Sequence, residues 1–233
     1  MNILVTGASR GIGRVIALEM KKLGNVFVSA RDENLLKNIG ASGYCVCDLF
    51  EKPEILGDFI KKNKIDVLIN NAGEYEYRGI AELNLKDIEH MCRVNLEVPL
   101  YLISCAVSQM RSQKWGRIVN IGSISGVMGE ANASVYSATK SGLIGMTRAL
   151  ALELATDGIT INTINPGWVD TDLGNRSISD SDFTRDEILE CIPQRRFVTP
   201  EEIALTVKYL ISDGAKGITG QSINICAGLS VGI

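Results

Sequence analysis

The chain has 233 residues, a single histidine and a formal net charge of −3, because its 24 basic residues nearly balance 27 acidic ones. This length predicts one domain spanning residues 1–233, and the charge provides no basic face for nucleic acid or an anionic membrane, so we expect neither partner. The apolar runs fall short of the roughly 18 residues that span a bilayer. No basic segment precedes the first of them as in a signal peptide, so we predict a cytoplasmic protein whose six cysteines are reduced.

Short apolar runs typical of strands alternate along the chain with segments of helical apolar spacing. The strand-like runs are Ile3–Val5, Val26–Val28, Tyr44–Val46, Val67–Ile69, Ile118–Ile121, Ile159–Ile164 and Ile223–Ile225. The helical segments are Ile12–Leu23, Ile55–Lys62, Ile88–Met110, Ser137–Leu154 and Pro200–Ile211. This alternation predicts an α/β fold: a single Rossmann-type, doubly wound parallel sheet of about seven strands with helices on both faces.

The first strand-like run is followed by the glycine-rich turn Thr6–Gly13, with the spacing G-x-x-x-G-x-G. Missing Cβ atoms allow a tight turn and a close approach of the backbone to a pyrophosphate, while the N-terminus of the next helix presents N–H groups to the phosphates. The turn therefore predicts a dinucleotide site, with a compact turn that binds nothing as the alternative. The candidate cofactor-binding residues in it are Gly7, Ser9, Arg10, Gly11, Ile12 and Gly13.

The end of the second strand-like run indicates which dinucleotide binds. An acidic residue there would bind the ribose hydroxyls of NAD, whereas a nearby arginine accepts the 2′-phosphate of NADP. The run ends at Ala30, followed by Arg31 and then by Asp32, which we interpret as a helix cap. Arg31, helped by Arg10, therefore favours NADP(H), and a solvated surface arginine is the alternative.

Small or polar residues follow three further strands, as Asn70–Gly73, Ser123 and Pro166–Gly167. The carboxyl ends of strands in an open α/β sheet face one crevice where ligands bind, and Ser123 could there donate to a substrate carbonyl. Tyr136 and Lys140 are four residues apart in a helical segment and so share one face. An ammonium near a phenol favours the phenolate and makes a general acid–base, although a surface pair on a helix is the alternative.

One long segment, Gly167–Phe183, shows neither the apolar runs of strands nor the apolar spacing of helices, and it is rich in Ser, Asp, Asn and Gly. Irregular loops of this length are often functional lids. We therefore expect a substrate lid around residues 167–195, with a disordered surface loop as the alternative.

Taken together, these motifs resemble those of the classical short-chain dehydrogenase/reductases over essentially the whole chain. The resemblance is carried by Thr6–Gly13, Asn71–Gly73, Asn95, Ser123, Tyr136, Lys140, Pro166, Gly167 and Thr171. It implies that Tyr136 donates the proton in carbonyl reduction, that Ser123 positions the carbonyl, and that Lys140 holds the nicotinamide ribose and lowers the pKa of Tyr136. It also implies that the backbone of Asn95 holds a water linking Lys140 to solvent.

The same resemblance extends the cofactor site. Asp48, beside Leu49, matches an adenine-contacting position, with a loop Asx-turn as the alternative, while Val169 and Thr171 match positions near the nicotinamide carboxamide and the diphosphate. The candidate catalytic residues are then Asn95, Ser123, Tyr136 and Lys140. The cofactor-binding candidates beyond the first turn are Arg31, Asp48, Leu49, Asn71, Ala72, Gly73, Tyr136, Lys140, Pro166, Gly167, Val169 and Thr171. We predict no metal site, because Cys45 and Cys47 have no second cysteine pair to complete one.

Within the family the chain most resembles the 3-oxoacyl-[acyl-carrier-protein] reductases of fatty acid biosynthesis, through Gly116–Ser123, Tyr136–Met146 and Ile218–Gln221. Many sugar, steroid and small-ketone reductases share these stretches, so another NADP-dependent reductase or dehydrogenase remains the alternative. A non-catalytic nucleotide-binding regulator would require a broken catalytic set. An acyl-carrier protein as partner is favoured by Lys114, which matches a basic position of those reductases, but Asp157 stands where they often have an arginine.

Two helical segments carry more apolar residues than one buried face requires, which predicts a second burial partner. These residues are Val94, Leu96, Val98, Leu100, Leu102 and Ile103 in the first segment and Leu143, Met146, Leu150 and Leu154 in the second. We therefore expect a homotetramer, or at least a homodimer, with Ile223–Ile225 contributing to the other interface. The alternative is that all of these side chains pack within one chain.

Overall fold

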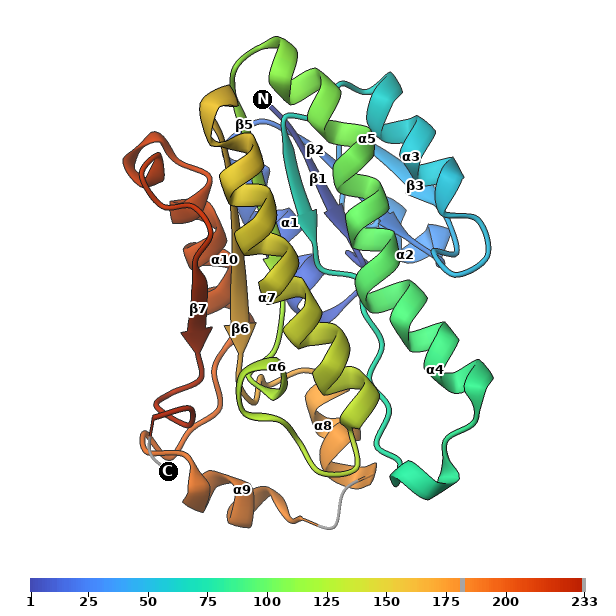
Figure 1. Cartoon of the computed structure of the whole chain (residues 1–233), viewed down its shortest axis with the longest axis vertical. Helices are drawn as coiled ribbons and strands as arrows, with labels where there is room; N and C mark the ends of the chain where they lie inside the picture. Colours follow the sequence, from blue (N-terminus) through green and yellow to red (C-terminus); the bar gives the residue numbers. More distant parts are fainter. Residues whose placement is uncertain (181–182, 232–233) are drawn as a thin grey trace.

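The computed structural model describes residues 1–180 and 183–231, and within them seven parallel strands form one sheet (Figure 1). The strands are β1 (Asn2–Thr6), β2 (Asn25–Ala30), β3 (Gly43–Val46), β4 (Val67–Asn70), β5 (Gly116–Ile121), β6 (Ile159–Pro166) and β7 (Ser222–Ile225). Their order across the sheet is β3-β2-β1-β4-β5-β6-β7. The predicted fold class and the predicted strands are confirmed.

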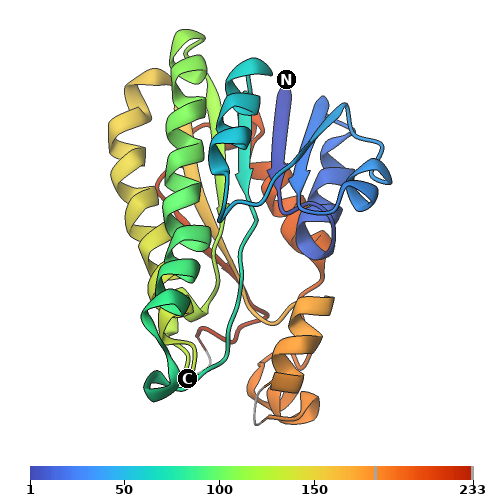
Figure 2. The same cartoon turned by 90° about the vertical axis from the view of Figure 1, so that its right-hand side faces the viewer.

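Helices cover both faces of this sheet (Figure 2). The α-helices in chain order are α1 (Gly11–Met20), α2 (Glu33–Lys37), α3 (Pro53–Lys62), α4 (Leu85–Cys92), α5 (Val98–Ser112), α6 (Ser125–Met128), α7 (Ser134–Leu154), α8 (Asp172–Asp180), α9 (Arg185–Cys191) and α10 (Pro200–Leu210). Successive side chains of a strand point to opposite faces. Ile3 and Val5 of β1 accordingly pack with α1, α2 and α10, whereas Leu4 packs with α3, α5 and α7. Burial on both faces explains why the strand sequences are continuously apolar.

The strand order changes direction beside β1. From β1 the chain proceeds through β2 to β3 on one side, and it then returns to place β4 on the other side of β1. A crevice opens at such a reversal outside the carboxyl ends of the strands, and ligands of α/β proteins bind there. The loops that follow β1 and β4 meet at this point.

The expectation of an irregular segment over Gly167–Phe183 is wrong. The structure contains helix α8 in this stretch and helix α9 directly after it, both beyond the carboxyl end of the sheet (Figure 1). Polar caps start the two helices: Thr171 Oγ1 accepts a hydrogen bond from the Gly174 N–H, and Thr184 forms a capping box with Glu187. Short helices that bury few side chains carry little apolar periodicity, so the pattern missed them. The part of the predicted lid at residues 181–182 lies outside the described residues.

Most of the apolar residues expected between subunits pack within the chain instead. Val94, Val98, Leu102, Ile103, Leu143 and Leu154 are buried. Leu96, Met146 and Leu150 are half-buried. Leu100 on α5 is 46% exposed, and Leu152 on α7, which was not in the predicted set, is 84% exposed. None of the helices in residues 1–180 and 183–231 is long and apolar enough to cross a membrane.

Candidate active site

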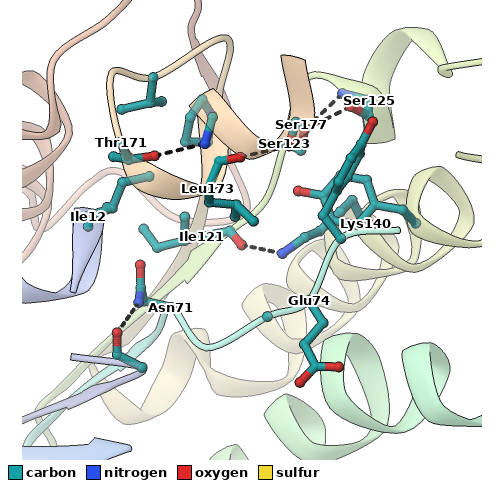
Figure 3. A pocket seen from close by; sticks show the side chains of 18 of the residues that line it. Ile12, Asn71, Glu74, Ile121, Ser123, Ser125, Lys140, Thr171, Leu173 and Ser177 are labelled. Atoms are coloured by element: carbon teal, nitrogen blue, oxygen red, sulfur yellow. Dashed lines mark hydrogen bonds between the residues drawn. The ribbon is translucent and has the colours of Figure 1, made fainter. Parts of the chain in front are cut away.

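A cavity of about 1330 Å³ lies at the carboxyl ends of the strands, where the sequence places the candidate residues (Figure 3). The predicted residues that line it are Gly7, Ser9, Arg10, Gly11, Ile12, Gly13, Arg31, Asp48, Leu49, Asn71, Ala72, Gly73, Ser123, Tyr136, Lys140, Pro166, Gly167, Val169 and Thr171. Asn95 lies directly behind this lining, against Gly73. The fold therefore brings together residues that are spread over 165 positions of the sequence, from Gly7 to Thr171.

The glycine-rich turn after β1 packs backbone against backbone with the loop after β4. A Cβ on Gly7, whose φ is +65°, would lie 2.8 Å from the Cα of Ala72, and a Cβ on Gly13 would lie 2.3 Å from Asn71 Nδ2. Asn71 Nδ2 donates hydrogen bonds to the carbonyl oxygens of Thr6 (2.9 Å) and Gly7 (3.2 Å). Side chains larger than hydrogen at the two glycines would therefore push these loops apart.

The end of α1 that faces the cavity has the features of an anion site. Gly11, Ile12 and Gly13 form the first turn of the helix and line the cavity. Unpaired N–H groups and the positive end of the helix dipole favour a phosphate at such a position. Thr171 stands opposite, because a Cβ on Gly11 would lie 3.7 Å from its Cγ2 atom.

Beyond β2 and β3 the cavity is lined by charged side chains. Arg31 is 64% exposed, and its Nη1 atom lies 3.4 Å from Glu74 Oε1 and 3.9 Å from Asp48 Oδ2. Asp48 Oδ1 also accepts a hydrogen bond from the Phe50 N–H at 2.9 Å, so the Asx-turn considered as the alternative is formed while Asp48 still lines the cavity. Asp32 caps α2, as predicted, by accepting from the Leu35 N–H.

The predicted catalytic side chains meet where β5 ends and α7 begins. Lys140 is buried and its Nζ atom donates to the carbonyl oxygen of Ile121 at 3.0 Å. The same Nζ lies 5.5 Å from the centre of the Tyr136 ring, one helical turn away. Ser123 follows β5 and reaches the same part of the cavity (Figure 3).

Burial acts on the protonation of this pair in opposite directions. The pKa of Tyr136 is raised to about 12: burial is the main cause, a hydrogen bond with Ser123 opposes it, and the charge of Glu130 adds to it. Burial lowers the pKa of Lys140 to about 8. In this structure the pKa of Tyr136 is raised, chiefly by burial, rather than lowered as was expected from Lys140.

Asn95 is placed by an irregularity in its helix. The predicted helix Ile88–Met110 is divided into α4 and α5 by the π-helical turn Arg93–Glu97, a feature that often marks functional positions. The buried amide of Asn95 accepts from the Glu74 N–H and donates to the Glu74 carbonyl oxygen, both at 2.8 Å. A Cβ on Gly73 would lie 3.1 Å from Asn95 Oδ1 and 3.3 Å from Lys140 Nζ, so Gly73 allows both to approach the cavity wall.

A polar network that the sequence did not predict lies beside the candidate catalytic residues. Ser123 Oγ donates to Ser125 Oγ at 3.0 Å, and Ser125 Oγ donates to Glu130 Oε2 at 2.6 Å. The other carboxylate oxygen of Glu130 accepts from the Tyr75 hydroxyl at 2.7 Å. The Tyr75 ring packs edge-on against the Tyr136 ring with centres 5.0 Å apart. Only the place of Ser125, two residues after Ser123, pointed to this network in the sequence.

Cys45 and Cys47 were the cysteines considered as metal ligands. Cys45 and Cys47 are buried and free, and burial raises the pKa of Cys47 to about 11. A thiol with a raised pKa forms little of the thiolate that binds metals or attacks substrates. Among residues 1–180 and 183–231, no group of three or more His, Cys, Asp or Glu side chains is placed to hold a metal ion.

A doubly wound parallel sheet, a glycine-rich turn at its strand reversal and a Ser–Tyr–Lys set at the same cavity define an oxidoreductase that uses a nicotinamide cofactor. A family model described as enoyl-(acyl carrier protein) reductase matches residues 7–230. The chain belongs to the short-chain dehydrogenase/reductase family.

Relatives of similar length belong to the same family. A 3-oxoacyl-[acyl-carrier-protein] reductase of Rickettsia conorii is 37% identical, over 97% of this chain and 95% of the relative. The reductase of the same name from Staphylococcus epidermidis is 38% identical, over 97% of both.

Solved structures show the same fold. A variant of the actinorhodin polyketide ketoreductase, crystallised with NADPH, superposes with a TM-score of 0.90 at 36% identity, covering 99% of this chain and 97% of that one. A putative gluconate 5-dehydrogenase from Beutenbergia cavernae with bound NADP has a TM-score of 0.92 at 31% identity, covering 98% and 96%.

Proposed function

We propose that the protein uses NADPH to reduce the ketone of a 3-oxoacyl thioester to a secondary alcohol. The observation that carries this proposal is the placement of Ser123, Tyr136 and Lys140 at one end of a cavity whose other end carries the glycine-rich turn and Arg31. The names of the Rickettsia and Staphylococcus relatives support the choice of an acyl thioester.

The residues present fit the cofactor. The first turn of α1, Gly11–Gly13, lines the cavity with Thr171 opposite Gly11, and these residues would hold the pyrophosphate. Arg31 would bind the 2′-phosphate, with Arg10 as a second cation. The further contacts assigned to the cofactor are Ser9, Asp48 and Leu49 toward the adenine half, Asn71, Ala72 and Gly73 in the middle, and Lys140, Pro166, Gly167 and Val169 toward the nicotinamide half.

The bound cofactor supplies hydride to the carbonyl carbon, and the protein supplies the proton. A buried phenol with a pKa near 12 is protonated at neutral pH, so Tyr136 carries the proton that the developing alkoxide requires. Ser123 holds the carbonyl oxygen beside Tyr136. Asn95 and Lys140, which approach one another across Gly73, lie behind the site on the path by which we expect the Tyr136 proton to be replaced.

A specific observation favours a second candidate, the reduction of a hydroxylated ketone such as a sugar. The Glu130 carboxylate is linked to Ser123 through the hydroxyl of Ser125, and its oxygens can accept hydrogen bonds from substrate hydroxyl groups. The surface around Lys114 is also less suited to an acidic carrier protein. Asp157 pairs there with Lys114 at 2.7 Å and with Arg111 at 2.9 Å and so neutralises these basic groups. The thioester itself is therefore the proposed substrate, whether or not a carrier protein delivers it.

A panel assay separates these candidates. Acetoacetyl and longer 3-oxoacyl thioesters of N-acetylcysteamine, keto-sugars, small diketones and ketosteroids are each supplied with NADPH or NADH, and kcat/KM is compared. We expect the thioesters with NADPH to be reduced fastest. A keto-sugar with a higher kcat/KM would replace the proposed substrate class, and no turnover of any carbonyl would contradict the reductase activity itself.

A further inference from the structure

The carboxylate of Glu74 lies between two basic side chains at the Arg31 end of the cavity. Its Oε1 atom is 3.4 Å from Arg31 Nη1, and its Oε2 atom is 2.6 Å from His90 Nε2. Glu74 and Arg31 both line the cavity. In Figure 3 the Glu74 side chain points away from Ser123 and Lys140, so it belongs to the cofactor end and takes no part in the proton network.

The position of Glu74 is held from two directions. Its backbone N–H and carbonyl both bond to the amide of Asn95 at 2.8 Å, which fixes where the side chain starts. His90, which holds the carboxylate, packs its ring against Phe50 with centres 4.3 Å apart. Phe50 is in turn bonded through its N–H to Asp48 and through its carbonyl to Arg93. The carboxylate is therefore kept beside Arg31 by the surrounding fold.

This arrangement conflicts with the role assigned to Arg31. The guanidinium proposed to bind a 2′-phosphate is already in contact with one carboxylate and lies 3.9 Å from a second, that of Asp48. A phosphate that reaches Arg31 must displace Glu74 or accept a like charge at close range. A ligand that lacks the 2′-phosphate meets neither cost.

We propose that Glu74 is a specificity-determining residue that reduces the preference for NADP(H) over NAD(H) by competing with the 2′-phosphate for Arg31. This inference rests on the proposed function only in assigning the 2′-phosphate to Arg31, and it is independent of the carbonyl substrate. It predicts that this enzyme tolerates NADH better than a relative with an uncharged side chain at this position.

The test measures binding of two cofactor fragments, 2′,5′-ADP and 5′-AMP, by isothermal titration calorimetry of the full chain. Glu74→Gln keeps the shape and the backbone bonds to Asn95 but removes the charge. We expect it to tighten 2′,5′-ADP about fivefold, the upper range for an exposed ion pair, and to change 5′-AMP less than twofold. Glu76→Gln is the matched control, since Glu76 pairs with Arg78, and it should change neither.

A double variant shows whether the effect passes through Arg31. In an Arg31→Ala background the gain from Glu74→Gln should vanish. A gain that persists there would overturn the proposal, and so would weaker 2′,5′-ADP binding by Glu74→Gln, because Glu74 would then be positioning Arg31 for the phosphate. Arg31→Ala alone tests the earlier assignment separately: unchanged 2′,5′-ADP binding would remove Arg31 as the phosphate ligand. The ratio of kcat/KM for NADPH and NADH should follow the binding ratio.

Discussion

Tyr136 and Lys140 form a pair in which burial favours the uncharged form of each side chain. The pKa of Tyr136 is raised to about 12 and that of Lys140 is lowered to about 8. A protonated phenol suits the reductive direction, because the reaction consumes a proton at the carbonyl oxygen. The first two predictions therefore concern the proton on Tyr136, which lies one turn from Lys140 on α7.

Replacing Tyr136 by Phe keeps the ring and removes only the transferable proton. We expect kcat for ketone reduction to fall by at least about 10²-fold, the contribution typical of a general acid. Cofactor affinity, measured by fluorescence titration of NADPH, should change little because the ring still packs against Tyr75. A variant that keeps most of its turnover would remove Tyr136 as the proton donor.

The charge of Glu130 helps to keep Tyr136 protonated, since it raises the pKa of that phenol. A general acid loses activity as the pH rises through its pKa. Removing the charge in Glu130→Gln lowers that pKa, so the alkaline limb of kcat/KM for reduction should move to lower pH, by up to about one unit. Tyr75→Phe, which keeps the carboxylate and the ring, is the control and should leave the limb in place. An unmoved limb in Glu130→Gln would show that the carboxylate does not act on Tyr136.

At the scale of elements, the turn between β1 and α1 depends on its contact with the loop after β4. Gly13→Ala would place a methyl group 2.3 Å from Asn71 Nδ2 and 2.5 Å from the Gly7 carbonyl oxygen. Overpacking of this kind costs about 1–3 kcal/mol. We expect the free energy of unfolding in urea to fall by this amount and cofactor affinity to fall with it.

The control for that substitution is Gly217→Ala, where an added Cβ meets no atom of the described residues within 4 Å. It should change the free energy of unfolding by less than about 0.5 kcal/mol. Equal effects at the two glycines would mean that the β1–α1 turn tolerates a side chain.

Helices α8 and α9 are the elements that we expect to act as the lid. They are short, they stand beyond the sheet, and α8 contributes Leu173 and Ser177 to the cavity wall. Elements with few buried side chains open locally at little cost in free energy. In hydrogen-exchange mass spectrometry the amides of α8 should exchange fast without ligand and slow at least several-fold with NADPH and a ketone analogue. The amides of α10, which buries four side chains, are the internal reference. Equal protection of α8 and α10 without ligand would argue against a lid.

For the whole molecule, the open question is how the outer faces of α5 and α7 are covered. Most apolar side chains of these helices are buried inside the chain, but Leu100 and Leu152 remain exposed, and β7 is the last strand of the sheet within residues 1–180 and 183–231. We still expect at least a homodimer. Sedimentation equilibrium at micromolar concentration should give a multiple of 25.3 kDa. A species of one chain would contradict the prediction, and a dimer would leave only one of the two expected interfaces.

The sequence alone determined the features that depend on neighbours along the chain. Strand and helix alternation, the glycine spacing of Gly7–Gly13 and the four-residue separation of Tyr136 and Lys140 are short-range patterns. Backbone sterics and helical periodicity give such patterns one interpretation wherever they occur. They were sufficient for the fold class and for the first candidate residues, whereas Asp48, Val169 and Thr171 were implied only by the family resemblance.

Only the tertiary structure decided the features that depend on contacts between distant segments. The π-turn at Asn95 is held by hydrogen bonds to the Glu74 backbone, the Glu74 carboxylate lies beside Arg31, and the Glu130 carboxylate accepts from Ser125. A carboxylate in a loop is not part of a periodic sequence pattern, and its partner depends on which strand ends lie close together in the sheet. Its role therefore becomes visible only once the sheet has brought those ends together.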